Sequence, residues 1–242
     1  MIKQKDSRKT EVETQMKILF VSDYVCPYCL VAKEAMKQAA EELGIHPEIT
    51  WHPFELTVEP APRVDTYHDE TRKAHYQVLV EPCRSLGLDM KLPPHVVPRP
   101  YTGLAFEGFY YAKAQGKEEE YNDLLYRAYF TEELDIGDPE VLCELAERVG
   151  LDREGYREAL AKRTYREELA AANRHAREEL HVTHVPTIFI DGKEVSVQEY
   201  TKEEFADLFR RFLDCCGQDE RNGETADQKQ EFHGCGPDGC NF

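Results

Sequence analysis

Two cysteines separated by two residues, Cys26 and Cys29, are the side chains of this 242-residue chain best suited to covalent chemistry. An apolar run at 18–21 precedes them, and apolar residues recur with helical spacing over 31–43 after them. A C-x-x-C pair between a buried strand and a long helix is typical of a thiol redox site. The alternative, half of a zinc site, requires a second ligand pair at compatible spacing and short loops in place of the helix.

Pro27 indicates which of the two sulfurs attacks a substrate. Proline suits the first residue of a helix, since its missing N–H has no intrahelical acceptor there, and this places Cys26 near the N-cap. The positive end of the helix stabilises a thiolate, so we expect Cys26 to have a lowered pKa and to be the nucleophile. Cys29, one turn further along, is expected to resolve the mixed disulfide. Tyr28 between them is a candidate substrate contact, and Gly44 marks the expected end of the helix.

A second segment, Val185-Pro186-Thr187, lies directly before the apolar run 188–190. Bonds that precede proline adopt the cis form at modest cost, and in redox domains of this type such a bond brings the backbone of Val185 beside the attacking sulfur. We therefore expect Val185 and Pro186 to bind an extended substrate, with His184 as a candidate contact. The alternative is an ordinary trans proline that begins an edge strand.

The residues around this segment predict a hairpin and a final helix. The turn at 191–192 is Asp-Gly, which favours a tight hairpin between strands at 187–190 and 194–197. A capping-box motif at 201–204 then predicts a helix that runs to Leu213.

Two further segments complete the expected architecture. A strand at 48–54 follows the first helix, which predicts a right-handed β-α-β crossover whose second strand ends near Phe54. Between positions 65 and 166 the apolar residues keep helical spacing, so we expect an all-helical insertion that covers the redox face.

Three separated segments resemble the DsbA family of thioredoxin-fold proteins, and within it the FrnE-like cytoplasmic branch. They are 22–29, 53–56 and 181–187. The resemblance covers residues 16 to about 213. It implies a thiol-disulfide oxidoreductase with Cys26 and Cys29 as the redox pair and Pro186 as a cis-proline. His184 stands where such loops often carry glycine or another small residue, which implies an altered substrate surface.

The expected fold class is therefore α/β: a thioredoxin fold with a long all-helical insertion and a cysteine-containing C-terminal tail. Its expected parts are a charged N-terminal extension (1–15), the first thioredoxin half (16–65), the helical insertion (66–166), the second thioredoxin half (167–213) and the tail (214–242).

The tail holds half of the eight cysteines. Cys235 and Cys240 enclose two glycines and a proline that permit a turn, so they can close a small disulfide loop. This C-x4-C pair resembles a second redox motif of some FrnE-like proteins, and we expect it to exchange electrons with the C-x-x-C pair. Two alternatives remain open: an idle tail, or a metal site formed from Cys215, Cys216, His233, Cys235 and Cys240.

Composition limits the classes of partner and the cellular compartment that we expect for this protein. A net charge of −17 argues against nucleic acid, and no apolar segment approaches the roughly 20 residues of a membrane span. The charged N-terminus lacks a signal core, so we expect a cytoplasmic protein, where reducing conditions favour a disulfide reductase or isomerase.

The expected partners are protein or small-molecule disulfides and a thiol reductant such as thioredoxin or glutathione, without a cofactor or a metal. The competing functions are a redox-sensing interaction protein, a glutathione-dependent isomerase or transferase, and, more weakly, a chaperone-like holdase. Cysteine at both positions of the motif argues against the transferase.

Overall fold

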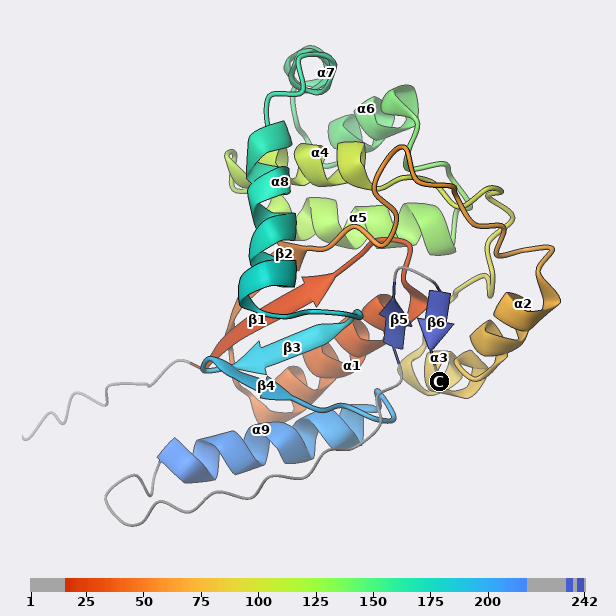
Figure 1. Ribbon diagram of the computed structural model, residues 1–242. Helices are drawn as coiled ribbons and strands as arrows, with labels where there is room; N and C mark the ends of the chain where they lie inside the picture. The colour runs from red at the N-terminus through yellow and green to blue at the C-terminus, as the bar shows by residue number, and fades with distance from the viewer. Residues whose placement is uncertain (1–15, 217–233, 237–238, 242) are drawn as a thin grey trace, which may run out of the picture.

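The computed structural model describes residues 16–216, 234–236 and 239–241 (Figure 1). Its four-stranded sheet has the order β2-β1-β3-β4. The strands are β1 (Lys17–Ser22), β2 (Glu48–Pro53), β3 (Thr187–Ile190) and β4 (Lys193–Val195). β2 pairs with β1 in parallel, whereas β3 is antiparallel to β1 and β4 to β3. The order and directions are those of a thioredoxin fold, as predicted.

β1 occupies the middle of the described sheet, which explains its apolar sequence. Phe20 and Val21 are both fully buried although their side chains point to opposite faces. The register sets Ile18 between Ile49 of β2 and Ile190 of β3. A strand covered on both faces in this way requires layers of helices above and below it.

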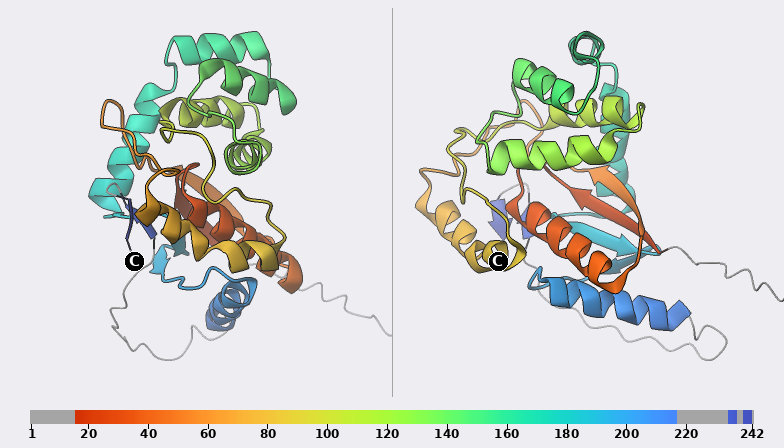
Figure 2. Two further views of the ribbon diagram at one scale, coloured as in Figure 1. Left: turned by 90° about the vertical axis from the view of Figure 1, so that its right-hand side faces the viewer. Right: turned by 180° about the vertical axis from the view of Figure 1, so that it is seen from behind.

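Helix α1 (Pro27–Leu43) follows β1 and confirms the predicted boundaries. Pro27 is its first residue, Cys26 is its N-cap, and Gly44 ends it in the left-handed conformation at φ 65°. α1 packs against α9 (Lys202–Cys216), and both lie on one face of the sheet (Figure 2).

Every regular secondary-structure element between β2 and β3 is a helix. They are α2 (Glu70–Gln77), α3 (Val80–Leu86), α4 (Gly103–Lys113), α5 (Glu118–Phe130), α6 (Pro139–Arg148), α7 (Arg153–Ala161), α8 (Arg166–Arg174) and the π-helical turn η1 (His175–Glu179). The helical spacing from Tyr76 to Cys83 is divided between α2 and α3, because Pro82 has no N–H and is tolerated only near a helix start.

The helices of this insertion share one continuous core with the sheet. Most of its aromatic side chains are buried in that core: Tyr76, Phe106, Phe109, Tyr121, Tyr126, Tyr129, Phe130 and Tyr156. Helix α8 contacts β2, so it covers the face of the sheet opposite α1. Among the helices described, none is both long and apolar enough to cross a membrane.

Two boundaries in the second half differ from the predictions. The predicted Asp-Gly turn is present, with positive φ at Asp191 and Gly192, but β4 begins and ends earlier than 194–197. Half of the predicted capping box is confirmed, since Thr201 Oγ1 accepts from the N–H of Glu204 at 3.2 Å. The Glu204 carboxylate accepts instead from the N–H groups of the residues just before Thr201, at 198–200. Helix α9 then continues to Cys216, beyond the predicted end at Leu213, because no glycine or proline stops it before Gly217.

Candidate redox site

The C-x-x-C pair lies where β1 passes into α1. The N–H of Cys26 donates to the carbonyl of Asp23 at 3.1 Å, and the N–H of Cys29 donates to the carbonyl of Cys26 at 3.2 Å. These two bonds form a tight turn that places the sulfur-bearing residues at the N-terminal end of α1. Both cysteines are reduced and fully buried, with 0% exposure.

The cis-proline segment completes the site from the other end of the chain. The Val185–Pro186 peptide bond is cis, and the Cys26 thiol donates to the carbonyl of Val185 at 3.4 Å. Thr187 holds this segment, since its hydroxyl donates to the carbonyl of His184 at 2.8 Å. The fold thus brings together Cys26 and Val185, which are 159 positions apart in sequence.

His184 and Tyr28, the two predicted substrate contacts, differ in how far their side chains are buried. His184 is half-buried, and burial lowers its pKa while the charges of Glu194 and Cys26 act in the opposite direction. It therefore lies within electrostatic reach of the predicted nucleophile. The Tyr28 side chain is only 2% exposed and packs against Tyr200 with 5.6 Å between ring centroids. In this arrangement Tyr28 supports the site from inside and offers almost no surface to a partner.

A buried carboxyl group beside the two thiols was not singled out from the sequence. Asp23 is fully buried, and its Oδ2 accepts from the N–H of Leu56 at 2.7 Å. Its pKa is raised to about 6, chiefly by burial and to a smaller extent by the charge of Cys26, against the opposing effects of the Leu56 N–H, Arg99 and Thr102. The one available signal was an acidic residue at the end of an otherwise apolar strand, three positions before Cys26.

The Cys29 thiol has the properties of a resolving group. Burial raises its pKa well above the ordinary value, and the neighbouring sulfur of Cys26 raises it further. Such a thiol stays protonated until a base removes the proton. Asp23, which interacts with Cys29 through its charge and its backbone, is a candidate for that base.

The insertion also contributes to this site. Tyr126 of α5 is buried, and its ring meets that of Tyr24 edge-on at 5.2 Å. Burial raises the pKa of its hydroxyl, and the charges of Cys29 and Tyr24 act in the same direction. A helix from the middle of the sequence therefore contributes a side chain next to the C-x-x-C turn.

The predicted auxiliary pair is described only by its backbone. β5 (Gly234–Gly236) and β6 (Gly239–Asn241) form an antiparallel hairpin in which Cys235 and Cys240 are directly opposite each other. β6 contacts α2, and the hairpin lies at the end of the sheet where α1 and β3 begin (Figures 1 and 2).

The other tail expectations lie outside what the structure describes. His233 is not among the described residues, and the side chains of Cys215, Cys216, Cys235 and Cys240 are not described either. Within the described part of the chain, no group of three or more His, Cys, Asp or Glu residues could hold a metal ion.

Comparison with known proteins agrees with this geometry. A family model, DSBA-like thioredoxin domain, matches residues 17–207. The uncharacterized protein YwbO of Bacillus subtilis (strain 168) is 43% identical over 170 residues, which make up 70% of this chain and 84% of YwbO.

Two solved structures illustrate the range of similar folds. Probable DsbA oxidoreductase SCO1869 from Streptomyces coelicolor superposes with a TM-score of 0.68 at 28% identity, over 94% of this chain and 99% of that one. Cytosolic disulfide reductase DsbM from Pseudomonas aeruginosa, solved with GSH, has a TM-score of 0.60 at 18% identity, over 84% and 99% of the two chains. At 18% identity the second likeness concerns the fold alone.

Proposed function

This chain belongs to the family of DSBA-like thioredoxin domains, and on that premise we propose that it is a thiol-disulfide oxidoreductase with Cys26 as nucleophile. The observation that carries the proposal is the position of Cys26. It is the N-cap of α1 and donates to the carbonyl next to a cis-proline, with a second thiol one turn further on. Disulfide exchange requires such a pair: one sulfur to attack and one to resolve.

The proposed reaction proceeds in two exchanges. The Cys26 thiolate attacks one sulfur of a substrate disulfide, so that a mixed disulfide forms and the other substrate sulfur leaves as a thiolate that takes up a proton. Cys29 then gives its proton to Asp23 and attacks the sulfur of Cys26, which releases the second substrate thiol. Two electrons pass from the protein thiols to the substrate, and the protein is left with a Cys26–Cys29 disulfide.

The backbone at Val185 supports the recognition of extended chains. In the free protein its carbonyl accepts the hydrogen bond of the Cys26 thiol. Once Cys26 becomes a thiolate it has no proton to donate, and the carbonyl is free to accept from a substrate N–H. Because Cys26 exposes no surface, a substrate reaches it only after covering groups move aside.

We assign the protein to the FrnE-like cytoplasmic branch, with protein or small-molecule disulfides as substrates. The supporting residues are the three segments that resemble that branch. In the cytoplasm an external thiol, thioredoxin or glutathione, must reduce the Cys26–Cys29 disulfide to complete a reductase or isomerase cycle. DsbM, which shares the fold, is described as a cytosolic disulfide reductase and was solved with GSH.

The C-terminal hairpin is the proposed carrier of these electrons. Its register sets Cys235 opposite Cys240, and residues opposite each other in an antiparallel pair have Cα atoms about 4.5 to 5.5 Å apart. That separation suits a disulfide. The contact of β6 with α2 supports an exchange in which a reduced Cys235–Cys240 pair attacks the Cys26–Cys29 disulfide and is itself oxidised.

Insulin reduction tests the central proposal. With dithiothreitol or glutathione as donor, the Cys26→Ser protein is expected to lose turnover, whereas Cys143→Ser is the matched control because Cys143 is buried in α6. Turnover that survives Cys26→Ser would remove Cys26 as the nucleophile. If the wild-type protein is oxidised only once per molecule, it is a sensor and not an enzyme.

The relay has a separate test. The double variant Cys235→Ser, Cys240→Ser is expected to slow turnover with at least one of dithiothreitol, thioredoxin and glutathione, while the first exchange at Cys26 stays intact. Unchanged turnover with all three donors would refute the relay and leave the oxidoreductase proposal standing.

A further inference from the structure

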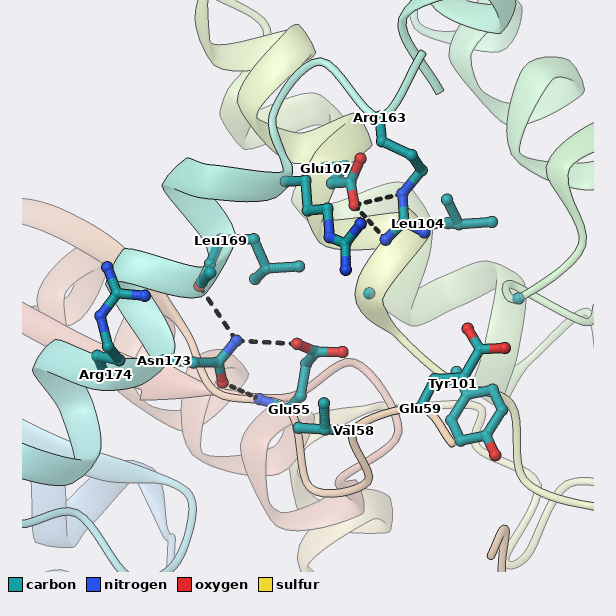
Figure 3. A pocket seen from close by; sticks show the side chains of 14 residues that line it. Glu55, Val58, Glu59, Tyr101, Leu104, Glu107, Arg163, Leu169, Asn173 and Arg174 are labelled. Carbon is teal, nitrogen blue, oxygen red and sulfur yellow. Dashed lines mark hydrogen bonds and ion pairs between the residues drawn. The ribbon is translucent and has the colours of Figure 1, made fainter. Parts of the chain in front are cut away.

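A cavity of about 700 Å³ lies apart from the redox site, between α4, α8 and the segment that follows β2 (Figure 3). None of the residues that line it belongs to the C-x-x-C turn or the cis-proline segment. The redox proposal does not use this cavity, so its lining must be explained separately.

Helix α8 presents one stripe of side chains to the cavity. Arg166, Leu169, Ala170 and Asn173 are spaced i, i+3, i+4 and i+7, which places them on a single helical face. At 1.5 Å per residue, Arg166 and Asn173 are about 10 Å apart along the helix axis. The stripe is therefore basic at one end, apolar in the middle and amide-bearing at the other end.

The amide end holds a buried carboxyl group in a fixed position. Asn173 accepts from the N–H of Glu55 at 2.9 Å and donates to Glu55 Oε2 at 2.9 Å. Glu55 is only 7% exposed, and no described residue donates a hydrogen bond to its Oε1. Gly103 keeps space in front of this oxygen, since a Cβ at that position would lie 2.8 Å from it.

The opposite end combines an internal ion pair with the exposed guanidinium of Arg166. Arg163 donates to Glu107 Oε1 at 2.8 Å, and Glu107 is only 1% exposed (Figure 3). The Oε2 of Glu107 is buried without a hydrogen-bond partner in the described structure. Arg166 forms no ion pair with any residue that the structure describes, so its guanidinium remains available.

Aliphatic side chains separate these two polar ends. Leu169 lies between the Glu55–Asn173 pair and the Arg163–Glu107 pair, and Leu104 lines another wall (Figure 3). Glu59 and Arg174 add one exposed charge of each sign at the rim. The cavity therefore has a buried acceptor at one end, an apolar middle and, at the other end, a guanidinium with no ion-pair partner in the described part of the chain.

We propose that this cavity binds a small aliphatic aminocarboxylate, with its ammonium on Glu55 Oε1 and its carboxylate on Arg166. An ammonium supplies the charge-assisted donor that a desolvated carboxylate lacks. A guanidinium matches the two oxygens of a ligand carboxylate. The methylene chain between the two groups covers the leucines, and this combination excludes molecules that carry only one sign of charge.

Isothermal titration calorimetry on the full chain tests the site with three probes of the same chain length. 5-Aminopentanoate is expected to bind, whereas cadaverine, which has two ammonium groups, and glutarate, which has two carboxylates, are expected not to bind. Glu55→Gln and Arg166→Gln are each expected to weaken binding of 5-aminopentanoate by about tenfold or more, since each removes one charged partner.

Two controls keep the result interpretable. Glu167→Gln and Arg84→Gln remove one charge of each sign at exposed positions outside the cavity and are expected to leave binding unchanged. Arg166 is exposed, so its variant tests the site even if Glu55→Gln fails to fold. Failure of 5-aminopentanoate to bind, equal binding of glutarate, or full affinity in Arg166→Gln would overturn the proposal. The thiols play no part in this test, so its outcome is independent of the redox assay.

Discussion

The thiol of Cys26 donates a hydrogen bond to the carbonyl oxygen of Val185 at 3.4 Å. The bond joins the N-terminal end of α1 to the segment before β3, and these are the two parts of the chain that an incoming disulfide must meet. Its donor is the proton that Cys26 loses when it becomes a nucleophile. In the proposed mechanism, activation of the sulfur and release of this carbonyl for a substrate N–H are therefore the same event.

Replacement of Cys29 by serine is expected to stop the reaction at the mixed disulfide. Cys26 can still attack oxidised glutathione, but no second thiol one turn along the helix can then release the adduct. Mass spectrometry of the intact protein should show one glutathione on Cys29→Ser and none on Cys143→Ser. An adduct that persists when Cys26 is also replaced would place the reactive sulfur elsewhere.

Asp23→Asn is expected to change how stability depends on pH. The pKa of Asp23 is raised from its ordinary 3.8 to about 6, so between these values the folded protein binds more protons than the unfolded chain. This group therefore stabilises the fold at low pH, and its contribution is lost as pH rises through about 6. The wild type should lose roughly 3 kcal/mol relative to Asp23→Asn between about pH 4 and 7, at 1.36 kcal/mol per pKa unit.

Urea unfolding at several pH values measures this difference. Glu42→Gln is a useful comparison, because the Lys202 ammonium lowers the pKa of Glu42. The dependence of stability on pH that Glu42 contributes is therefore opposite to that of Asp23. Glu42 contributes stability that is present at neutral pH and lost on acidification. Parallel pH profiles for the wild type and Asp23→Asn would contradict the raised pKa of Asp23.

Asp123→Asn is expected to destabilise the contact between the insertion and the thioredoxin half. Lys33 of α1 pairs with Asp123 of α5, and its side chain is only 8% exposed. Its ammonium also lies 5.4 Å from the ring centre of Trp51. Loss of Asp123 leaves the Lys33 ammonium buried without its partner, which lowers the free energy of unfolding by about 1–3 kcal/mol. We expect the lower end of this range, because the Glu119 carboxyl group remains near Lys33.

The fluorescence of Trp51, the single tryptophan, reports this unfolding. Glu158→Gln is the matched control, since Glu158 pairs with Lys162 and the two side chains are 63% and 68% exposed. Its removal should change stability by less than about 0.5 kcal/mol. If Asp123→Asn and Glu158→Gln lower the free energy of unfolding equally, the burial of Lys33 does not increase the cost of losing its partner.

Gly108→Ala is expected to destabilise the insertion although alanine favours helices. A Cβ at position 108 in α4 would overlap the hydroxyl groups of Tyr121 and Tyr156, which hydrogen-bond each other at 2.6 Å. Overpacking of this kind costs about 1–3 kcal/mol, which exceeds the roughly 1 kcal/mol gained in helix propensity.

Tyr156→Phe supplies the control for this clash in urea-unfolding measurements. The Tyr156 hydroxyl is the nearest atom to the added Cβ, so Tyr156→Phe should make Gly108→Ala less costly. If the two substitutions prove strictly additive, the overlap is not the cause of the loss.

Local sequence alone predicted the elements of the redox half. Pro27 and Gly44 bound α1, an Asp-Gly turn joins β3 to β4, and Thr201 with Glu204 begins α9. These features depend on backbone preferences and hydrogen bonds within a few residues, so no long-range information was required. The same reasoning missed the break between α2 and α3 and the extension of α9, because packing competes with local preferences where a helix is interrupted or ends.

Only the tertiary structure decided which of these elements meet. The 3.4 Å contact of Cys26 with Val185, the burial of Asp23 beneath Leu56, and the cavity between Glu55 and Arg166 all join distant segments. Burial sets the pKa of a carboxyl group, and a sequence contains no statement of which residues will exclude water from it. The sequence therefore determined where the two proposed redox sulfurs stand, while the fold determined the carbonyl, the acid and the solvent exclusion that surround them.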